Sequence, residues 1–108
     1  MDLVKRFEIY FIEFNPTVGS EIKKTRPAVI ISPDEMNDAL NTVIVAPLTS
    51  TLKKYPSRVS CVVKNKKGQI ALDQLRSVDQ FRLKQKIAVL KENEQNEVLE
   101  ILNIIFSK

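Results

Sequence analysis

The sequence contains no histidine, one cysteine and only two glycines in 108 residues. Without histidine, no imidazole can serve as general acid or base, so any catalysis must depend on other side chains. The lone Cys61 excludes an internal disulfide and lies in a strand-like apolar run, where we expect it to be a small core residue. A chain without disulfides suits a reducing cytoplasm.

No apolar run approaches about 18 residues, so we expect no segment that spans a membrane. Residues 1–6 carry positive charge without a long apolar region after it, so we expect no secretory signal. The carboxylates show no metal-ligand spacing, and we therefore expect no metal and no other cofactor. By length, residues 1–108 form one domain.

The positive charge of the chain is unevenly distributed. The net charge is +4, with 15 basic and 9 acidic residues in positions 1–90 and 2 basic and 4 acidic residues in positions 91–108. The basic residues gather in three loop-like clusters over residues 23–26, 53–58 and 64–67. If these clusters share a face, they attract a polyanion; otherwise they are solvated loops of an ordinary soluble protein.

Short apolar runs dominate the first ninety residues and predict strands. We expect strands over residues 7–14, 27–32, 42–47, 58–63, 69–75 and 86–90. Residues 64–68 predict a hairpin turn, residues 34–40 a short helix or loop, and residues 78–81 a single turn. The glycines at 19 and 68 are expected in turns, Gly19 as the hinge of a loop.

The last segment is the one clear helix of the sequence. Asn93 is the expected N-cap, and Val98, Ile101, Leu102 and Ile105 form an apolar stripe at helical spacing. Further apolar residues widen that stripe and suggest a second packing surface: Leu99, Ile104 and Phe106. Short strands followed by one helix predict a mainly β fold, a small antiparallel barrel with a C-terminal helix.

Arg26 is the most informative candidate for a functional residue. It precedes Pro27, which pushes it into extended geometry at the root of a strand, and Lys23 and Lys24 lie just upstream. A fixed guanidinium beside lysines is suited to binding phosphate.

Five segments of the chain resemble the MazF/PemK/Kid toxins in order and spacing. They are RFEIY at 6–10, NPTVGSE at 15–21, TRPAVIIS at 25–32, VAPLTS at 45–50 and LDQLR at 72–76. The resemblance implies an SH3-like barrel that forms a homodimer. It also implies a metal-independent endoribonuclease that cuts single-stranded RNA at a short sequence and leaves 2′,3′-cyclic phosphate and 5′-hydroxyl ends. An antitoxin with an acidic, flexible tail would cover the cleavage groove.

By this resemblance Arg26 and Thr49 are the catalytic pair. Arg26 would stabilise the pentacoordinate phosphate, and Thr49 would orient the phosphate or the attacking hydroxyl. Glu21 lies in the same loop as Arg26 and is the candidate general base. The alternatives are structural: Arg26 as a surface residue paired with Glu21 or Asp73, and Thr49 as a cap that bonds nearby backbone at a strand end.

Further polar and aromatic residues are candidates for RNA binding. Tyr55 sits among basic residues and would stack on a base or pack on the barrel rim, and Gln74 would read RNA or bond backbone. The candidates are Ser20, Lys23, Lys24, Lys53, Lys54, Tyr55, Gln74 and Arg76.

One position departs from the family pattern. The family usually has glycine between the arginine and the acidic residue near the start, and this chain has Phe7 there. Two other functions stay open at the level of sequence. CcdB-like toxins share the barrel but act on DNA gyrase, and a non-catalytic barrel would bind nucleic acid or an acidic peptide without cleavage.

Overall fold

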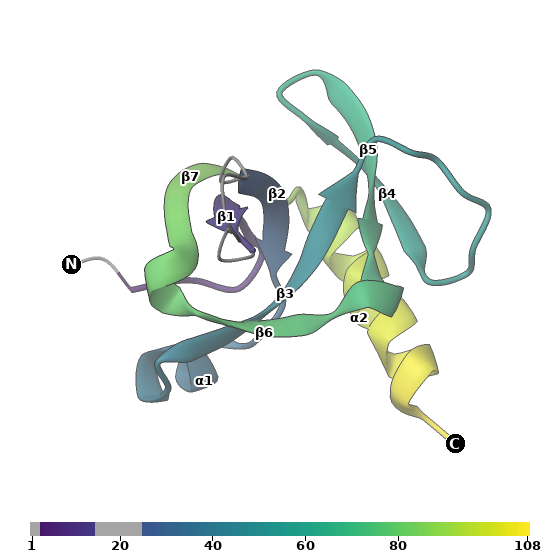
Figure 1. The fold of residues 1–108 in the computed structure, drawn as a ribbon. Coiled ribbons are helices and arrows are strands. Elements are labelled where there is room, and N and C mark those ends of the chain that lie inside the picture. The colour runs from purple at the N-terminus through teal and green to yellow at the C-terminus, as the bar shows by residue number, and fades with distance from the viewer. Residues whose placement is uncertain (1–2, 15–24) are drawn as a thin grey trace, which may run out of the picture.

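An antiparallel sheet curls into a half-barrel, and the C-terminal helix packs against it (Figure 1). The computed structural model describes residues 3–14 and 25–108. Its elements are β1 (Glu8–Glu13), β2 (Thr25–Ile30), α1 (Asp34–Ala39), β3 (Thr42–Thr49), β4 (Arg58–Val63), β5 (Lys66–Ala71), β6 (Arg76–Asp79), β7 (Leu83–Val89) and α2 (Glu92–Phe106), with 3-10 turns at Leu72–Gln74 and Gln80–Arg82. This confirms the predicted fold class. No helix in the described ranges has the length and apolar character needed to cross a membrane.

Strand β3 is the centre of the sheet because it pairs along both edges. On one edge, residues 45–47 pair with residues 28–30 of β2. On the other edge, residues 42–45 pair with β6 and residues 48–49 pair with β5. The order of the main path is β4-β5-β3-β2-β1-β7, with β6 beside β3. Pairing with β3 therefore sets the positions of β2, β5 and β6.

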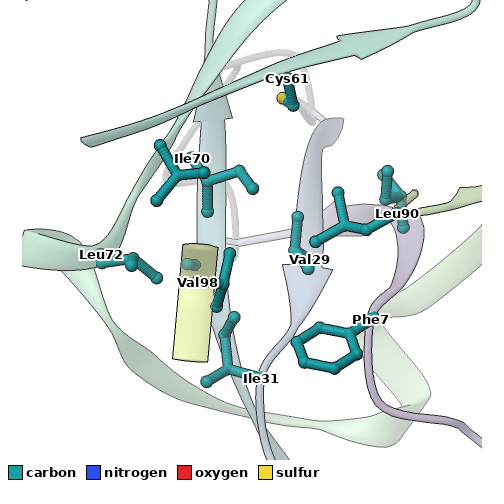
Figure 2. Packing of buried hydrophobic residues seen from close by; sticks show 11 residues of the cluster. Phe7, Val29, Ile31, Cys61, Ile70, Leu72, Leu90 and Val98 are labelled. Carbon is teal, nitrogen blue, oxygen red and sulfur yellow. The ribbon is translucent and has the colours of Figure 1, made fainter. Parts of the chain in front are cut away.

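Side chains on the two faces of the sheet form two apolar clusters. The first cluster lies on the face that α2 covers, and Val98 of the helix lies among Val29, Ile31 and Leu72 (Figure 2). Its buried members are Phe7, Ile9, Val29, Ile31, Ala46, Val59, Cys61, Ile70, Leu72, Leu90 and Val98. The second cluster consists of Val4, Ile12, Ala28, Ile30, Val43, Val45 and Val78. The expectation that Cys61 is a core residue is thus confirmed.

The N-cap of helix α2 lies two residues earlier than the sequence suggested. Its N-cap is Lys91, so the prediction of Asn93 is wrong. The Lys91 amide donates to Glu94 Oε1 at 2.9 Å, and the Val62 amide donates to Glu94 Oε2 at 3.0 Å. This buried carboxylate both caps the helix and ties it to β4, which outweighs the intrinsic preference for asparagine at the cap.

The apolar stripe of α2 is buried only in part. Val98 is fully buried, and Ile101 and Leu102 pack against the first cluster, as expected for a core stripe. Ile105 is 40% exposed and Phe106 is 73% exposed, so Ile105 does not belong to the core. The C-terminal end of the helix extends past the sheet, which leaves its last apolar residues without a strand to cover (Figure 1).

The β4–β5 hairpin turns earlier than its glycine suggested. Lys64 and Asn65 have φ values of 48° and 67°, and β5 begins directly after them at Lys66. Gly68 therefore lies inside a strand, not in the turn. A Cβ atom at Gly68 would lie 3.0 Å from the carbonyl oxygen of Thr49, so glycine is favoured here by close backbone approach rather than by a turn.

Two other boundaries differ from the sequence prediction. Strand β5 ends at Ala71, and a 3-10 turn over Leu72–Gln74 replaces the expected continuation to residue 75. The expected single turn over residues 78–81 is split, because Val78 belongs to β6 and buries its side chain in the second cluster. Val78 belongs to a strand because it pairs with Val43 of β3, a contact that a local pattern does not contain.

Phe7 occupies a backbone conformation that favours glycine. Its φ is 72°, its amide donates to the Ile30 carbonyl at 2.7 Å, and its carbonyl accepts from the Leu90 amide at 3.0 Å. The ring is 8% exposed and belongs to the first cluster. The left-handed conformation costs a side-chain-bearing residue about 1–2 kcal/mol, and burial of the ring offsets that cost.

The opposing contributions at Phe7 predict an unusual order of variants. Phe7→Ala loses the buried ring but keeps a Cβ at positive φ, so we expect it to lower the free energy of unfolding by about 3–5 kcal/mol. Phe7→Gly loses the same ring but relieves the strain, and we expect it to be about 1 kcal/mol more stable than Phe7→Ala. Urea unfolding of the three proteins measures both differences. An alanine variant as stable as the glycine variant would show that strain at residue 7 is negligible.

Candidate functional site

Arg26 lies in the second position of β2 and opposes Ile12 of β1. Paired residues of neighbouring strands share a face, so the Arg26 side chain leaves the sheet on the face of the second cluster, to which Ile12 belongs. Arg26 is exposed, and among the described residues it has no ion-pair partner. The predicted placement of Arg26 at the root of a strand is confirmed.

Thr49 is the last residue of β3 and lies on the same face as Arg26. The β2–β3 register pairs Ala28 with Pro47. Side chains two residues apart on a strand share a face, so Arg26 and Thr49 lie on the face of these two residues. On the other edge of β3, Thr49 pairs with Gln69 of β5. The guanidinium and the hydroxyl therefore extend from neighbouring strands on one side of the sheet.

The Thr49 hydroxyl is held by backbone but keeps its proton available. Its Oγ1 atom accepts a hydrogen bond from the Thr51 amide at 3.1 Å. The structural alternative for Thr49, a bond to nearby backbone at a strand end, is therefore present. A hydroxyl that accepts one hydrogen bond can still donate its proton. The bond from Thr51 therefore orients the hydroxyl and leaves its O–H available as a donor.

Arg76 adds a second guanidinium to the same face. It opposes Val45, a member of the second cluster, and is exposed. Its guanidinium lies 5.0 Å from the centre of the Phe14 ring, and Nη2 lies 3.5 Å from the Phe14 carbonyl oxygen. Arg82 Nη1 donates to the neighbouring carbonyl of Glu13 at 3.2 Å. The end of β1 is thus held by two arginines, of which the sequence analysis identified only Arg76.

The loop between β3 and β4 presents the predicted basic and aromatic residues. Lys53, Lys54 and Tyr55 are all exposed, Tyr55 by 51%. The Arg58 guanidinium lies 5.1 Å from the centre of the Tyr55 ring. Gln74, at the end of a 3-10 turn, is exposed and its side chain makes no hydrogen bond within the described part of the chain.

Asp73 anchors the far end of that loop. It accepts from Arg58 Nε at 2.8 Å and from the Ser57 hydroxyl at 2.8 Å. The bond from the Arg58 guanidinium lowers the pKa of Asp73 from 3.8 to about 2. Because Asp73 pairs with Arg58, the alternative in which it pairs with Arg26 is wrong.

Five of the residues singled out by sequence fall outside the described ranges. They are Gly19, Ser20, Glu21, Lys23 and Lys24. Their predicted roles as hinge, candidate base and phosphate contacts therefore stay predictions.

A cavity of about 380 Å³ lies beside the first cluster, and its lining reaches Thr49 and Ser50 at the end of β3. Its apolar lining includes Leu48, Cys61 and Val63, and its rim carries the lysines at 64, 66 and 67. Burial raises the pKa of the Cys61 thiol to about 11. The thiol therefore stays protonated at neutral pH and is a lining group rather than a nucleophile.

Comparison with known proteins identifies the family of this chain. The family model for the PemK-like, MazF-like toxins of type II toxin–antitoxin systems matches residues 5–106. This chain belongs to that family. The Endoribonuclease MazF of Staphylococcus epidermidis is 36% identical, with 94% of this chain and 90% of the relative covered. The resemblance noted in the sequence is therefore confirmed.

Solved MazF structures share the fold over almost the full chain. The MazF crystal structure from Deinococcus radiodurans is 25% identical, with 97% of each chain covered and a TM-score of 0.78. A MazE–MazF complex from the same organism, also 25% identical, matches with a TM-score of 0.83 over 97% of this chain and 96% of the other. The toxin MazF-mt6 of Mycobacterium tuberculosis, at 20% identity and a TM-score of 0.76, shares the fold, with 92% of this chain and 95% of the other covered.

The Arg58–Asp73 pair predicts acid sensitivity that Asp73→Asn removes. Because the pKa of Asp73 is lowered in the folded state, its ionised form stabilises the fold above about pH 4, and this contribution is lost as pH falls towards 2. We expect Asp73→Asn to be less stable than the wild type at pH 5–7, with the difference shrinking as pH falls towards 2. Urea unfolding at a series of pH values measures it. A difference that does not change with pH would rule out a stabilising ion pair.

Proposed function

We propose that this MazF-like toxin is a metal-independent endoribonuclease that cleaves single-stranded RNA at a short specific sequence. The single observation that carries the proposal is the common face of Arg26 and Thr49, a guanidinium and a held hydroxyl on the paired strands β2 and β3. The 94% coverage by a relative named Endoribonuclease MazF supports the same reaction class. The enzyme works in the cytoplasm as a homodimer.

The proposed reaction uses the substrate's own 2′-hydroxyl as nucleophile. Its oxygen attacks the adjacent phosphorus, its proton goes to a base, and the 5′ oxygen leaves and accepts a proton. The products are a 2′,3′-cyclic phosphate and a 5′-hydroxyl. Arg26 donates hydrogen bonds to the pentacoordinate phosphate, where negative charge accumulates, and to the leaving oxygen. Its guanidinium thereby supplies the charge stabilisation that a metal provides in other nucleases.

Thr49 has a positioning role at the reacting phosphate in this scheme. Because the Thr51 amide donates to Oγ1, the hydroxyl proton points away from that amide and donates to a phosphate oxygen or to the attacking hydroxyl. Phosphates along the strand contact Lys53, Lys54 and Arg76, with Lys23 and Lys24, and a base stacks on Tyr55. Ser20 and Gln74 contribute further polar contacts to the RNA.

Removal of the guanidinium or the hydroxyl should stop cleavage without unfolding the protein. We expect Arg26→Ala to reduce the cleavage rate of a long RNA by about 10²–10³-fold in the presence of EDTA. Arg26→Lys keeps the charge but not the planar donors, so we expect an intermediate rate. Thr49→Val should be slow and Thr49→Ser close to wild type. A gel assay with mapped ends measures rate, end chemistry and sequence preference together.

The same assay separates the other functions. Intact RNA together with inhibition of DNA gyrase would assign the chain to the CcdB-like mode of action. An Arg26→Ala variant that is no less toxic and binds RNA normally would indicate a non-catalytic barrel. Cleavage that requires an added divalent metal would contradict the metal-independent mechanism.

Glu21 is the proposed general base, because it lies in the same loop of the sequence as Arg26 and no histidine is available. We expect Glu21→Gln to slow cleavage while leaving RNA binding intact, since the amide keeps the shape but cannot take the proton. Single-turnover cleavage measures the expected loss of rate, and a binding titration on the same oligonucleotide measures RNA affinity. Wild-type cleavage by this variant would remove Glu21 from the mechanism.

The partner of the proposed toxin is an antitoxin with an acidic, flexible tail. Such a tail is attracted to the same basic face as RNA and competes with it, so both interactions weaken as salt rises. Solved MazE–MazF complexes among the structural matches support an antitoxin partner.

A further inference from the structure

Gln69 is a buried polar side chain that the proposed mechanism does not use. It lies in the middle of β5 and is 8% exposed. Its Oε1 atom accepts from the Lys53 amide at 2.9 Å, and its Nε2 atom donates to the Lys53 carbonyl at 2.9 Å. Both backbone groups of one loop residue are therefore bound by one side-chain amide, which satisfies the buried glutamine.

The position of Gln69 in the sheet links this loop to Thr49. Gln69 pairs with Thr49 on one side and with Ser60 on the other, so the three side chains share a face of the sheet. The next residue, Ile70, points to the opposite face and belongs to the first cluster. Gln69 thus fastens Lys53 over the face from which Thr49 extends.

The two anchors of the loop differ in their chemistry. At the far end, the Arg58–Asp73 pair is partly exposed and charged, because 35% of the Asp73 side chain remains accessible. At the near end, Gln69 is neutral and buried. Gln69 binds the backbone of Lys53, and Lys54 and Tyr55 come directly after it. Gln69 therefore fixes the position from which these three exposed side chains extend.

We propose that Gln69 is a positioning residue for RNA binding: it holds the backbone of Lys53 so that the exposed side chains of Lys53, Lys54 and Tyr55 meet the strand whose phosphate lies at Thr49. This inference rests on the proposed function. Gln69 itself touches no substrate. It orders the loop before RNA binds, which reduces the conformational entropy that is lost on binding.

The test replaces Gln69 by leucine, which keeps the volume and removes both hydrogen bonds. We expect KM for a cleavable RNA to rise about tenfold while kcat changes much less, because the lost interaction positions binding groups rather than reacting atoms. The log–log dependence of KM on salt should become shallower, as it would when phosphate contacts are lost, and should approach that of a Lys53→Ala, Lys54→Ala double variant.

Gln80→Leu is the matched control. The Gln80 amide also makes two bonds to backbone, donating to the carbonyls of Asn37 and Leu40 at 2.8 and 3.0 Å. Those carbonyls belong to α1 and the residue after it, away from the loop at 50–57. We expect this variant to lose stability without a change in KM or in salt dependence, which separates positioning from general destabilisation.

Hydrogen exchange of the Lys53 amide tests the clamp independently of any RNA. It should exchange about tenfold faster or more in Gln69→Leu than in the wild type. If Gln69→Leu does not fold, Gln69→Met serves instead, because its flexible chain packs more readily and likewise removes both bonds. Faster exchange with unchanged KM and salt dependence, or a fall in kcat at constant KM, would overturn the inference. A wild type that exchanges slowly at Lys53 but leaves RNA intact would overturn the proposed function instead.

Discussion

Pairing along both edges of β3 is the constraint on which the proposed site depends. One edge pairs β3 with β2, whose Arg26 lies on the same face as Thr49, and the other edge pairs Thr49 with Gln69. Arg26 of β2 and Gln69 of β5 are far apart in the sequence. They lie on the same face as Thr49 because β3 pairs with both of their strands. The close approach of Gly68 to the Thr49 carbonyl shows how little room this packing leaves. A side chain at position 68 would require the Thr49 carbonyl to shift by a few tenths of an ångström.

The two faces of the curled sheet have different roles because only one is covered by α2. On the covered face, the first cluster supplies apolar burial, and the carboxylate of Glu94 links the helix to β4. On the other face, exposed Arg26 and Arg76 surround the second cluster. Both faces therefore bury an apolar cluster, and the face that α2 leaves uncovered also carries the exposed guanidinium groups of Arg26 and Arg76.

Much of this arrangement could be predicted from local patterns. Period-2 and continuous apolar runs located most strands, and the residue before proline located the root of β2. Local patterns failed where a distant contact decided the outcome. Gly68 resembled a turn residue but is favoured by the close approach of the Thr49 backbone, and Asn93 resembled a cap but was displaced by the bond between Glu94 and the Lys91 amide. The role of Gln69 could not be predicted from local sequence, because its partner, the Lys53 backbone, is set by where the loop between β3 and β4 lies on the sheet.

The sequence by itself determined the family, the strand content and the absence of an imidazole, since these follow from residue types and their order. Only the tertiary structure decided that Arg26 and Thr49 share a face, that Asp73 belongs to Arg58, and that Phe7 is buried at positive φ. The physical reason is the same in each case. Register, ion pairing and backbone strain depend on which segments meet in space, and that is settled by the burial of the whole chain rather than by any one segment.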